Sequence, residues 1–139
     1  MVKDQHNRRI TNWTKNIDLY VKWTDEKGYG VFSHNPILKG ELIERCYCIK
    51  TGTPVSTALM DYVFNYPKGY DLGKGTQHVL PLGFGCIYNH ADDNNAMWFD
   101  TKDIPFHFDF IAQRDIAAHE EICTHYGNNY WPQKQNRSE

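Results

Sequence analysis

The chain has 139 residues and a mass of 16.3 kDa, a size that predicts one domain with a single core. Hydrophobic residues make up 40% of it and aromatic residues 14%, which excludes a disordered chain, and no apolar run approaches the roughly 18 residues of a membrane span. The net charge of −2 argues against a direct nucleic-acid partner, because nucleic acids select clustered basic residues, and it suits a basic peptide better.

The chain opens with a polar stretch, residues 1–16, that we expect to be an arm outside the core. Its charges are not followed by an apolar segment, so it is not a signal peptide, and we expect an intracellular protein. Leu19, Val21 and Trp23 then alternate with other side chains in the period-two pattern of a half-buried strand. Further along, the sequence predicts a turn at 25–28 and strands at 30–32 and 42–49.

The second half of the chain also predicts short strands between turns. The alternation of Phe106, Phe108 and Phe110 is the clearest strand pattern, and the proline and glycines of residues 66–75 predict an exposed hairpin tip. The other predicted elements are one or two helical turns at 57–62, a strand at 78–80, a buried turn or short helix at 82–88 and a strand at 122–126. These elements indicate a mainly β, non-repetitive domain followed by a polar tail, residues 132–139.

Four cysteines give little support for a metal site or a disulfide framework. Cys46 and Cys48 are two positions apart, so a strand would place both on one face, where Cys86 or Cys123 could join them. However, no CxxC pair is present to complete a tetrahedral zinc set, and an intracellular protein is not expected to form structural disulfides. We therefore expect reduced, mostly structural cysteines and no metal.

Three polar or glycine-rich motifs are candidates for function. The first is Gly28-Tyr29-Gly30, where glycines permit positive φ and the close approach of a ligand to the backbone. A lone GxG segment is usually only a turn. It is not a dinucleotide-binding fingerprint, because Ser33 occupies the position of the third glycine and no helix follows.

The second motif is the run from Tyr88 to Asn95, in which Asn89 and His90 follow an apolar approach. Polar side chains that emerge from buried surface must find hydrogen-bond partners, which favours a functional role. An Asx-rich turn is the alternative. Calcium binding is a further alternative, but the run lacks the glycine and terminal glutamate of an EF-hand loop.

The third motif is Glu120-Glu121 followed by a short apolar strand that ends in Tyr126-Gly127. Taken alone, a buried tyrosine usually packs its ring and donates its hydroxyl to backbone.

Taken together, these motifs resemble the SET-domain protein lysine methyltransferases, over residues 17–131. The form most similar is the compact, stand-alone SET protein of large algal viruses and bacteria, whose best-known viral member methylates a lysine on a core histone tail. The resembling segments are 28–32, 39–44, 61–64, 82–90, 120–122 and 126–131.

The resemblance implies a SET fold of short twisted sheets, few short helices and a pseudoknot-like crossing of the segments around Asn89 and Tyr126. It implies S-adenosylmethionine on one face and a protein or peptide substrate on the other, joined by a channel for the substrate lysine. Tyr126 would be the catalytic residue, and Tyr29 and Tyr62 would form the rest of the channel wall. Cofactor binding is implied for Lys27, Tyr29, Gly30, Asn89, His90 and, packing on the adenine, Trp131.

Other implied features leave alternatives open. Glu121 either contacts a basic substrate side chain or is an exposed glutamate at the edge of a strand. A histone tail is the expected substrate, which would place the protein in the nucleus. A non-histone protein would place it in the cytoplasm. The aromatic pair Tyr130 and Trp131, together with the dimeric viral form, leads us to expect a homodimer.

Several positions depart from the family pattern: Ala91, Asn94, His119 and, beside the expected peptide groove, Met60. These departures favour the rival hypothesis, an inactive SET fold that serves as a peptide-binding or scaffold protein.

Overall fold

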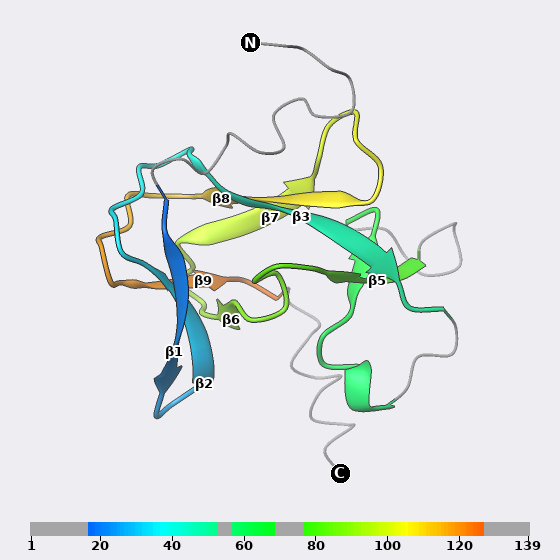
Figure 1. Cartoon of the computed structure of the whole chain (residues 1–139), viewed down its shortest axis with the longest axis horizontal. Helices are drawn as coiled ribbons and strands as arrows, with labels where there is room; N and C mark the ends of the chain where they lie inside the picture. The colour runs from blue at the N-terminus through cyan, green and yellow to red at the C-terminus, as the bar shows by residue number, and fades with distance from the viewer. Residues whose placement is uncertain (1–16, 53–56, 69–76, 127–139) are drawn as a thin grey trace.

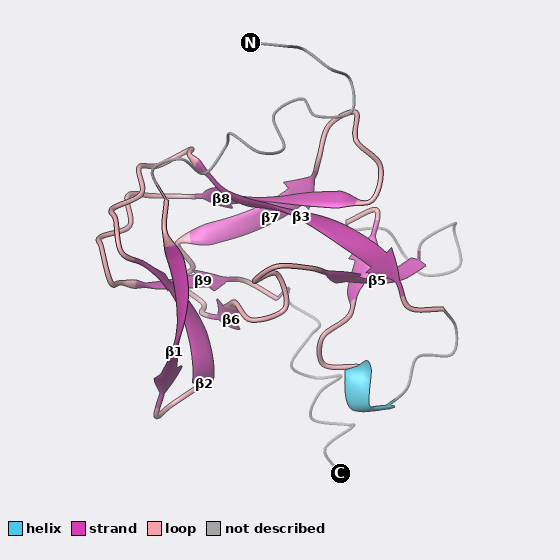
Figure 2. Ribbon diagram, viewed as in Figure 1, coloured by secondary structure: helices cyan, strands magenta, loops and turns pink. Residues whose placement is uncertain are grey.

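The computed structural model describes residues 17–52, 57–68 and 77–126. In chain order they form β1 (Leu19–Thr24), β2 (Gly28–Ser33), β3 (Leu42–Lys50), the short 3-10 helix η1 (Thr57–Leu59), β4 (Phe64–Tyr66), β5 (Gln77–Pro81), β6 (Asn89–His90), β7 (Ala96–Asp100), β8 (His107–Ala112) and β9 (Glu121–Thr124). Figures 1 and 2 show that strands dominate the described part of the chain, with η1 set apart from them. The predicted mainly β fold with little helix is confirmed.

The strands form two sheets. One has the order β1-β2-β9-β6 and the other β4-β5-β3-β8-β7. All pairs in both sheets are antiparallel except β6 and β9, which run parallel with Asn89 beside Cys123 and His90 beside Thr124. The β1–β2 hairpin extends away from β3, β7 and β8, while β6 and β9 lie between them (Figure 1). The parallel pair therefore brings two distant motifs of the sequence side by side.

The core forms from the alternating faces of β3 and β8. Phe108 and Phe110 point inward from β8 and are fully buried, together with Ile43 and Cys46 from β3. Burial of each large apolar side chain contributes about 1.5–3 kcal/mol relative to exposure. Two of the phenylalanines that alternate in the sequence, Phe108 and Phe110, are therefore among the residues that stabilise the core. Cys46 and Cys48 share the buried face of β3, as their spacing predicts.

A buried asparagine fastens β9 to the segment that follows β6. The Asn95 side chain donates to the backbone carbonyl of Glu121 (2.8 Å) and accepts from the backbone N–H of Cys123 (2.9 Å). Such an amide satisfies backbone groups on both sides of one residue of the strand. This contact holds the Asn89 segment against the strand that leads to Tyr126.

The structure corrects two expectations about strands. The β1 alternation is present and Leu19 packs against the core, but Val21 and Trp23, further along this edge strand, are exposed. β7 is absent from the prediction, since its residues do not alternate and they directly follow an asparagine-rich turn. Residues 82–87 are turn, as expected, but only partly buried.

Some expectations fall on residues that the structure does not describe: the arm 1–16, the hairpin tip within 69–76, Tyr130, Trp131 and the tail 132–139. Strands β4 and β5 pair on either side of that segment; β5 contains the strand predicted at 78–80, whereas β4 was not predicted. The homodimer and the adenine contact of Trp131 stay predictions. In the described part of the chain, no helix has the length and apolar character needed to cross a membrane.

Candidate active site

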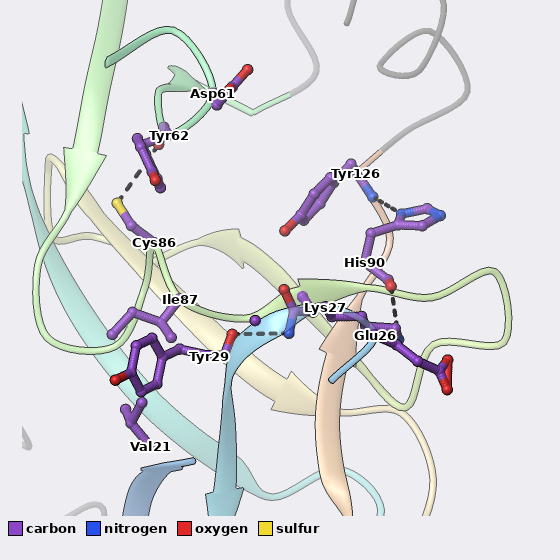
Figure 3. Close-up of a pocket in the computed structure, with 12 residues that line it drawn as sticks. Val21, Glu26, Lys27, Tyr29, Asp61, Tyr62, Cys86, Ile87, His90 and Tyr126 are labelled. Carbon is purple, nitrogen blue, oxygen red and sulfur yellow. Dashed lines mark hydrogen bonds between the residues drawn. The ribbon is translucent and has the colours of Figure 1, made fainter. Parts of the chain in front are cut away.

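One pocket of about 820 Å³ collects most of the residues singled out in the sequence (Figure 3). This volume lies within the range of roughly 300–1,000 Å³ that is usual for small-molecule sites. Five separate stretches of chain build its walls. The lining residues are Val21, Glu26, Lys27, Gly28, Tyr29, Asp61, Tyr62, Cys86, Ile87, Asn89, His90 and Tyr126.

The turn between β1 and β2 places Lys27 over the parallel pair. Gly28 has a φ of +76°, which a residue with a Cβ adopts rarely, and the Thr24 hydroxyl ties the turn by donating to the Gly28 carbonyl (2.7 Å). The Lys27 ammonium then donates to the backbone carbonyl of His90 (3.2 Å) and lies 3.8 Å from the Cys123 sulfur. A positive charge is thereby held at the junction of the hairpin with β6 and β9.

The Asn89 side chain contacts both the hairpin and β9. Its amide donates to the Tyr29 carbonyl (3.0 Å) and to the Glu121 carboxylate (2.7 Å). Gly30 is buried directly beside these groups: a Cβ there would overlap the Glu121 carboxylate and approach Asn89 Nδ2 to 3.1 Å. Gly30 therefore allows the close contact among β2, Asn89 and Glu121 rather than lining the pocket itself.

This placement corrects the expectation for Glu121. β9 lies between β2 and β6, so Glu121 is not on an edge strand, and its side chain is half-buried against Asn89. Glu121 is also not among the residues that line the pocket. The sequence could not show this, because the strand order depends on pairing between distant segments.

His90 links the parallel pair to Tyr126. Its Nδ1 accepts the backbone N–H of Tyr126 (2.9 Å), and its Nε2 lies 2.9 Å from the Asp92 carboxylate. Because a backbone N–H can only donate, Nδ1 must offer its lone pair, and the ring proton belongs on Nε2 facing Asp92. The ring also packs on Tyr126, with centroids 5.1 Å apart.

The Tyr126 side chain points into the pocket (Figure 3), and its hydroxyl donates to the Tyr88 carbonyl (2.8 Å). The Tyr88 hydroxyl donates in turn to buried Glu44 (2.6 Å), which also accepts the backbone N–H of Phe84 (2.9 Å). Burial raises the pKa of Glu44 above its usual value, partly offset by these hydrogen bonds, and burial with the nearby Glu44 charge raises the pKa of Tyr88. A polar chain thus runs from the core to the pocket.

The opposite wall is aromatic and apolar. Figure 3 shows Tyr62, Cys86, Ile87 and Tyr29 across the pocket from Tyr126. Tyr29 is 60% exposed and packs edge-on against Trp23, and Tyr62 is also exposed, so both rings have surface left to cover a ligand. The pocket is thus polar on the side of β6 and β9 and aromatic on the other.

The structure therefore brings together Lys27, Tyr29, Tyr62, Asn89, His90 and Tyr126, as the sequence predicts for one site. Gly28, a seventh lining residue, belongs to the first candidate motif, and the other five were not predicted as site residues: Val21, Glu26, Asp61, Cys86 and Ile87. The apolar alternation of β1 could have indicated Val21, and Asp61 directly follows the Met60 position that was considered beside the peptide groove. Cys86 and Ile87 lie within the segment 82–90 that carries the family resemblance, although no site role was assigned to them, and Glu26 lies in the predicted turn at 25–28.

The fold and the pocket define a small β-rich domain whose binding site lies where a parallel strand pair meets a β-hairpin. Residues 28–127 match the model of the SET domain, so the chain belongs to the SET domain family. The resemblance stated from the sequence is therefore confirmed, together with the SET fold.

The chain is similar to proteins that are named as histone methyltransferases. The chain is 28% identical over 120 residues to a Schizosaccharomyces pombe histone-lysine N-methyltransferase specific for H3 lysine-37, covering 81% of this chain and 76% of that protein. It is also similar to the crystal structure of a Plasmodium falciparum protein provisionally named histone methyltransferase, with a TM-score of 0.63, 30% identity and coverage of 82% and 96% of the two chains.

A second match, at 26% identity over 138 residues, is to a provisionally named histone-lysine N-methyltransferase 1 of Plasmodium falciparum. The match covers 86% of this chain but only 2% of that much longer protein. Family membership and these named relatives support methyltransferase activity.

Proposed function

We propose that the protein is an S-adenosylmethionine-dependent protein lysine N-methyltransferase. The observation that carries this proposal is the position of Tyr126, whose side chain lines the same pocket as Lys27, Asn89 and His90 and faces an aromatic wall. A positioned hydroxyl, a polar end and an aromatic passage are what methyl transfer to an amine requires.

The polar end of the pocket fits the cofactor. Lys27 supplies a positive charge for a carboxylate, and Asn89 supplies its side-chain oxygen as an acceptor, since both hydrogens of its Nδ2 donate within the protein. Close packing at Gly30 fixes the Asn89 amide against β2. When bound, S-adenosylmethionine supplies an electrophilic methyl group on a sulfonium.

Tyr126 can orient the substrate amine as a hydrogen-bond acceptor. Its hydroxyl hydrogen is directed at the Tyr88 carbonyl (2.8 Å), so the oxygen presents lone pairs toward the pocket. An amine N–H that donates to this oxygen has its own lone pair directed elsewhere, available for attack. Such alignment matters because positioning supplies much of the rate acceleration in bimolecular displacement.

The substrate lysine must lose a proton before it can react, since its free pKa is about 10.4. Tyr29, Tyr62 and Ile87 provide an apolar wall that removes water from the side chain. Desolvation disfavours the charged ammonium and lowers its pKa. The aromatic wall therefore promotes the reactive form without a dedicated base.

We propose a basic protein segment as the substrate, with a histone tail as the first candidate. Asp61, next to Tyr62 of the aromatic wall, adds an acidic residue to the pocket lining, where it favours positively charged residues beside the target lysine. The names of the relatives support a histone, which would place the protein in the nucleus. A non-histone protein is the alternative target.

Incubation with labelled S-adenosylmethionine and mixed histones tests the proposal. We expect label on lysine, and we expect Tyr126→Phe to lower kcat by about 100-fold or more, because a group that positions the reacting amine is lost. Tyr47→Phe is the matched control, since Tyr47 is exposed on β3 away from the pocket.

Calorimetry with the cofactor separates this proposal from the scaffold hypothesis. Cofactor binding by the wild type and by Tyr126→Phe with similar affinity, together with lost transfer in the variant, supports an enzyme. Absence of both cofactor binding and labelling on histones and cell lysate would favour an inactive SET fold that binds peptides.

A further inference from the structure

We propose that His90, Asp92 and His125 form a binding site for a divalent late transition metal such as Zn²⁺. The three side chains each offer one ligand atom, and these atoms all lie within 4.8 Å of one another. Two imidazoles and one carboxylate are a donor set that suits zinc and its neighbours, whereas magnesium prefers oxygen ligands alone. This cluster contains no cysteine, so it differs from the zinc set weighed from the sequence, and its histidines differ from the oxygen ligands of the calcium alternative weighed for the run from Tyr88 to Asn95.

The fold brings the three residues together from two distant segments. His90 lies in β6 and Asp92 follows it, while His125 follows β9, and the parallel pairing of β6 with β9 sets the two histidines side by side. Their ring centroids are 4.6 Å apart. An ion here would therefore link the two strands that carry the polar end of the pocket.

The present distances need little adjustment for coordination. Asp92 Oδ1 lies 2.9 Å from His90 Nε2 and 4.0 Å from His125 Nε2. Ligand atoms around a tetrahedral zinc ion at 2.0–2.1 Å are separated by about 3.4 Å. The Asp92 side chain is 95% exposed and can move to meet this spacing, and its exposure leaves room for a water as the fourth ligand.

Coordination has a consequence for Tyr126. A metal on His90 Nε2 replaces the ring proton there, and a neutral imidazole then carries its proton on Nδ1. In the structure, without metal, Nδ1 accepts the Tyr126 backbone N–H. A proton on Nδ1 would point at this N–H and break the hydrogen bond. Metal binding and the hydrogen bond that holds the Tyr126 backbone are therefore mutually exclusive.

The same exclusion gives the metal an inhibitory effect, and this part rests on the proposed function. Loss of the bond between His90 and the Tyr126 backbone removes one of the contacts that position the Tyr126 ring. Zinc would then slow methyl transfer reversibly, and a chelator would restore it.

The test begins with chelator-treated protein titrated with ZnCl₂, with MgCl₂ as the control ion. We expect Zn²⁺ to bind by calorimetry and Mg²⁺ not to bind. Asp92→Asn and His125→Asn should each weaken Zn²⁺ affinity by about tenfold or more, since each removes a ligand. Asp93→Asn is the matched control: Asp93 is 94% exposed beside Asp92 but pairs with Arg114.

Hydrogen exchange of the Tyr126 amide supplies a readout that needs no catalysis. Zn²⁺ should increase exchange at this amide in the wild type, and Asp92→Asn should need a Zn²⁺ concentration about tenfold higher or more for the same increase. Undetectable Zn²⁺ binding, or equal affinity in the wild type and Asp92→Asn, would overturn the site. Binding with unchanged Tyr126 exchange would overturn the exclusion.

Activity assays keep the two proposals apart. Zn²⁺ inhibition that Asp92→Asn relieves at least fivefold supports the inhibitory effect, and equal inhibition of both proteins overturns it. If no substrate is methylated while zinc binding depends on Asp92 and His125, the proposed function fails and the metal site stands.

Discussion

The Tyr126 hydroxyl donates to the Tyr88 carbonyl at 2.8 Å, and the Tyr88 hydroxyl donates to Glu44 at 2.6 Å. Glu44 is buried in β3, within the second sheet, whereas Tyr126 follows β9 of the first. Tyr88 therefore contacts the proposed catalytic hydroxyl through its backbone carbonyl and a carboxyl group in the core through its side chain. This connection leads to a prediction about pH.

Replacement of Glu44 by Gln should change how stability depends on pH. The pKa of Glu44 is raised by burial, so the folded state binds its proton more tightly than the unfolded state does. Between the unfolded pKa near 4.5 and the raised folded pKa, wild-type stability then falls as pH rises. Urea unfolding across this window measures the free energy of unfolding of both proteins. The wild-type value minus the Glu44→Gln value should decrease as pH rises. A shift in the opposite direction would contradict the burial of an ionisable Glu44.

Gly30→Ala should destabilise the site through Glu121 and Asn89. The added Cβ overlaps the Glu121 carboxylate, and overpacking of this kind typically costs about 1–3 kcal/mol. We expect lower stability and weaker cofactor binding. In a Glu121→Ala background the same change should cost clearly less, because its nearest obstacle is gone. Equal costs in both backgrounds, measured by urea unfolding, would show that Glu121 is not the obstacle.

Asp61→Asn should raise KM for a basic peptide with little change in kcat. Asp61 is exposed on the pocket lining, so its charge acts on substrate binding rather than on the reacting atoms. An effect of about two- to fivefold at low salt, reduced at high salt, fits an exposed charge. Asp103→Asn, an exposed change outside the pocket lining, is the control. Equal KM changes in the two variants would remove Asp61 from substrate recognition.

Cys86 should react slowly with alkylating reagents at neutral pH although it lines the pocket. Burial raises its pKa to about 11, and the thiolate is the reactive form. At pH 7.5 we expect alkylation at least about 100-fold slower than for a free cysteine, with a rate that increases about tenfold per pH unit. Peptide mass spectrometry after iodoacetamide treatment measures this. Rapid modification at pH 7.5 would show that the thiol is more open than the structure indicates.

The sequence predicted elements whose signal is local. Phe108 and Phe110 recur at every second position because β8 buries one face, and this pattern identifies the strand without knowledge of its partners, although Phe106 precedes the strand. The motifs around Asn89 and Tyr126 could be matched to one family because their residue types and order are distinctive. The structure places both on the same pocket.

What the sequence could not predict depends on which strands become neighbours. β1 is at the edge of its sheet, and its Val21 lines the pocket. β9 is in the interior of the same sheet, and its Glu121 contacts Asn89. The approach of His125 to His90 likewise requires the parallel pairing of β6 with β9. No periodicity in the chain encodes these long-range contacts.

The pocket has a thermodynamic consequence, because its walls come from five stretches between Val21 and Tyr126. A fragment that ends before β6 lacks Asn89, His90 and Tyr126 of the polar wall, so an incompletely folded chain has no complete binding site. A small molecule that occupies the pocket therefore binds only the folded state and stabilises it. By mass action, a ligand at 100 times its Kd would add about 2.7 kcal/mol to the unfolding free energy. The abundance of such a molecule in the cell would then help set how long the chain survives proteases.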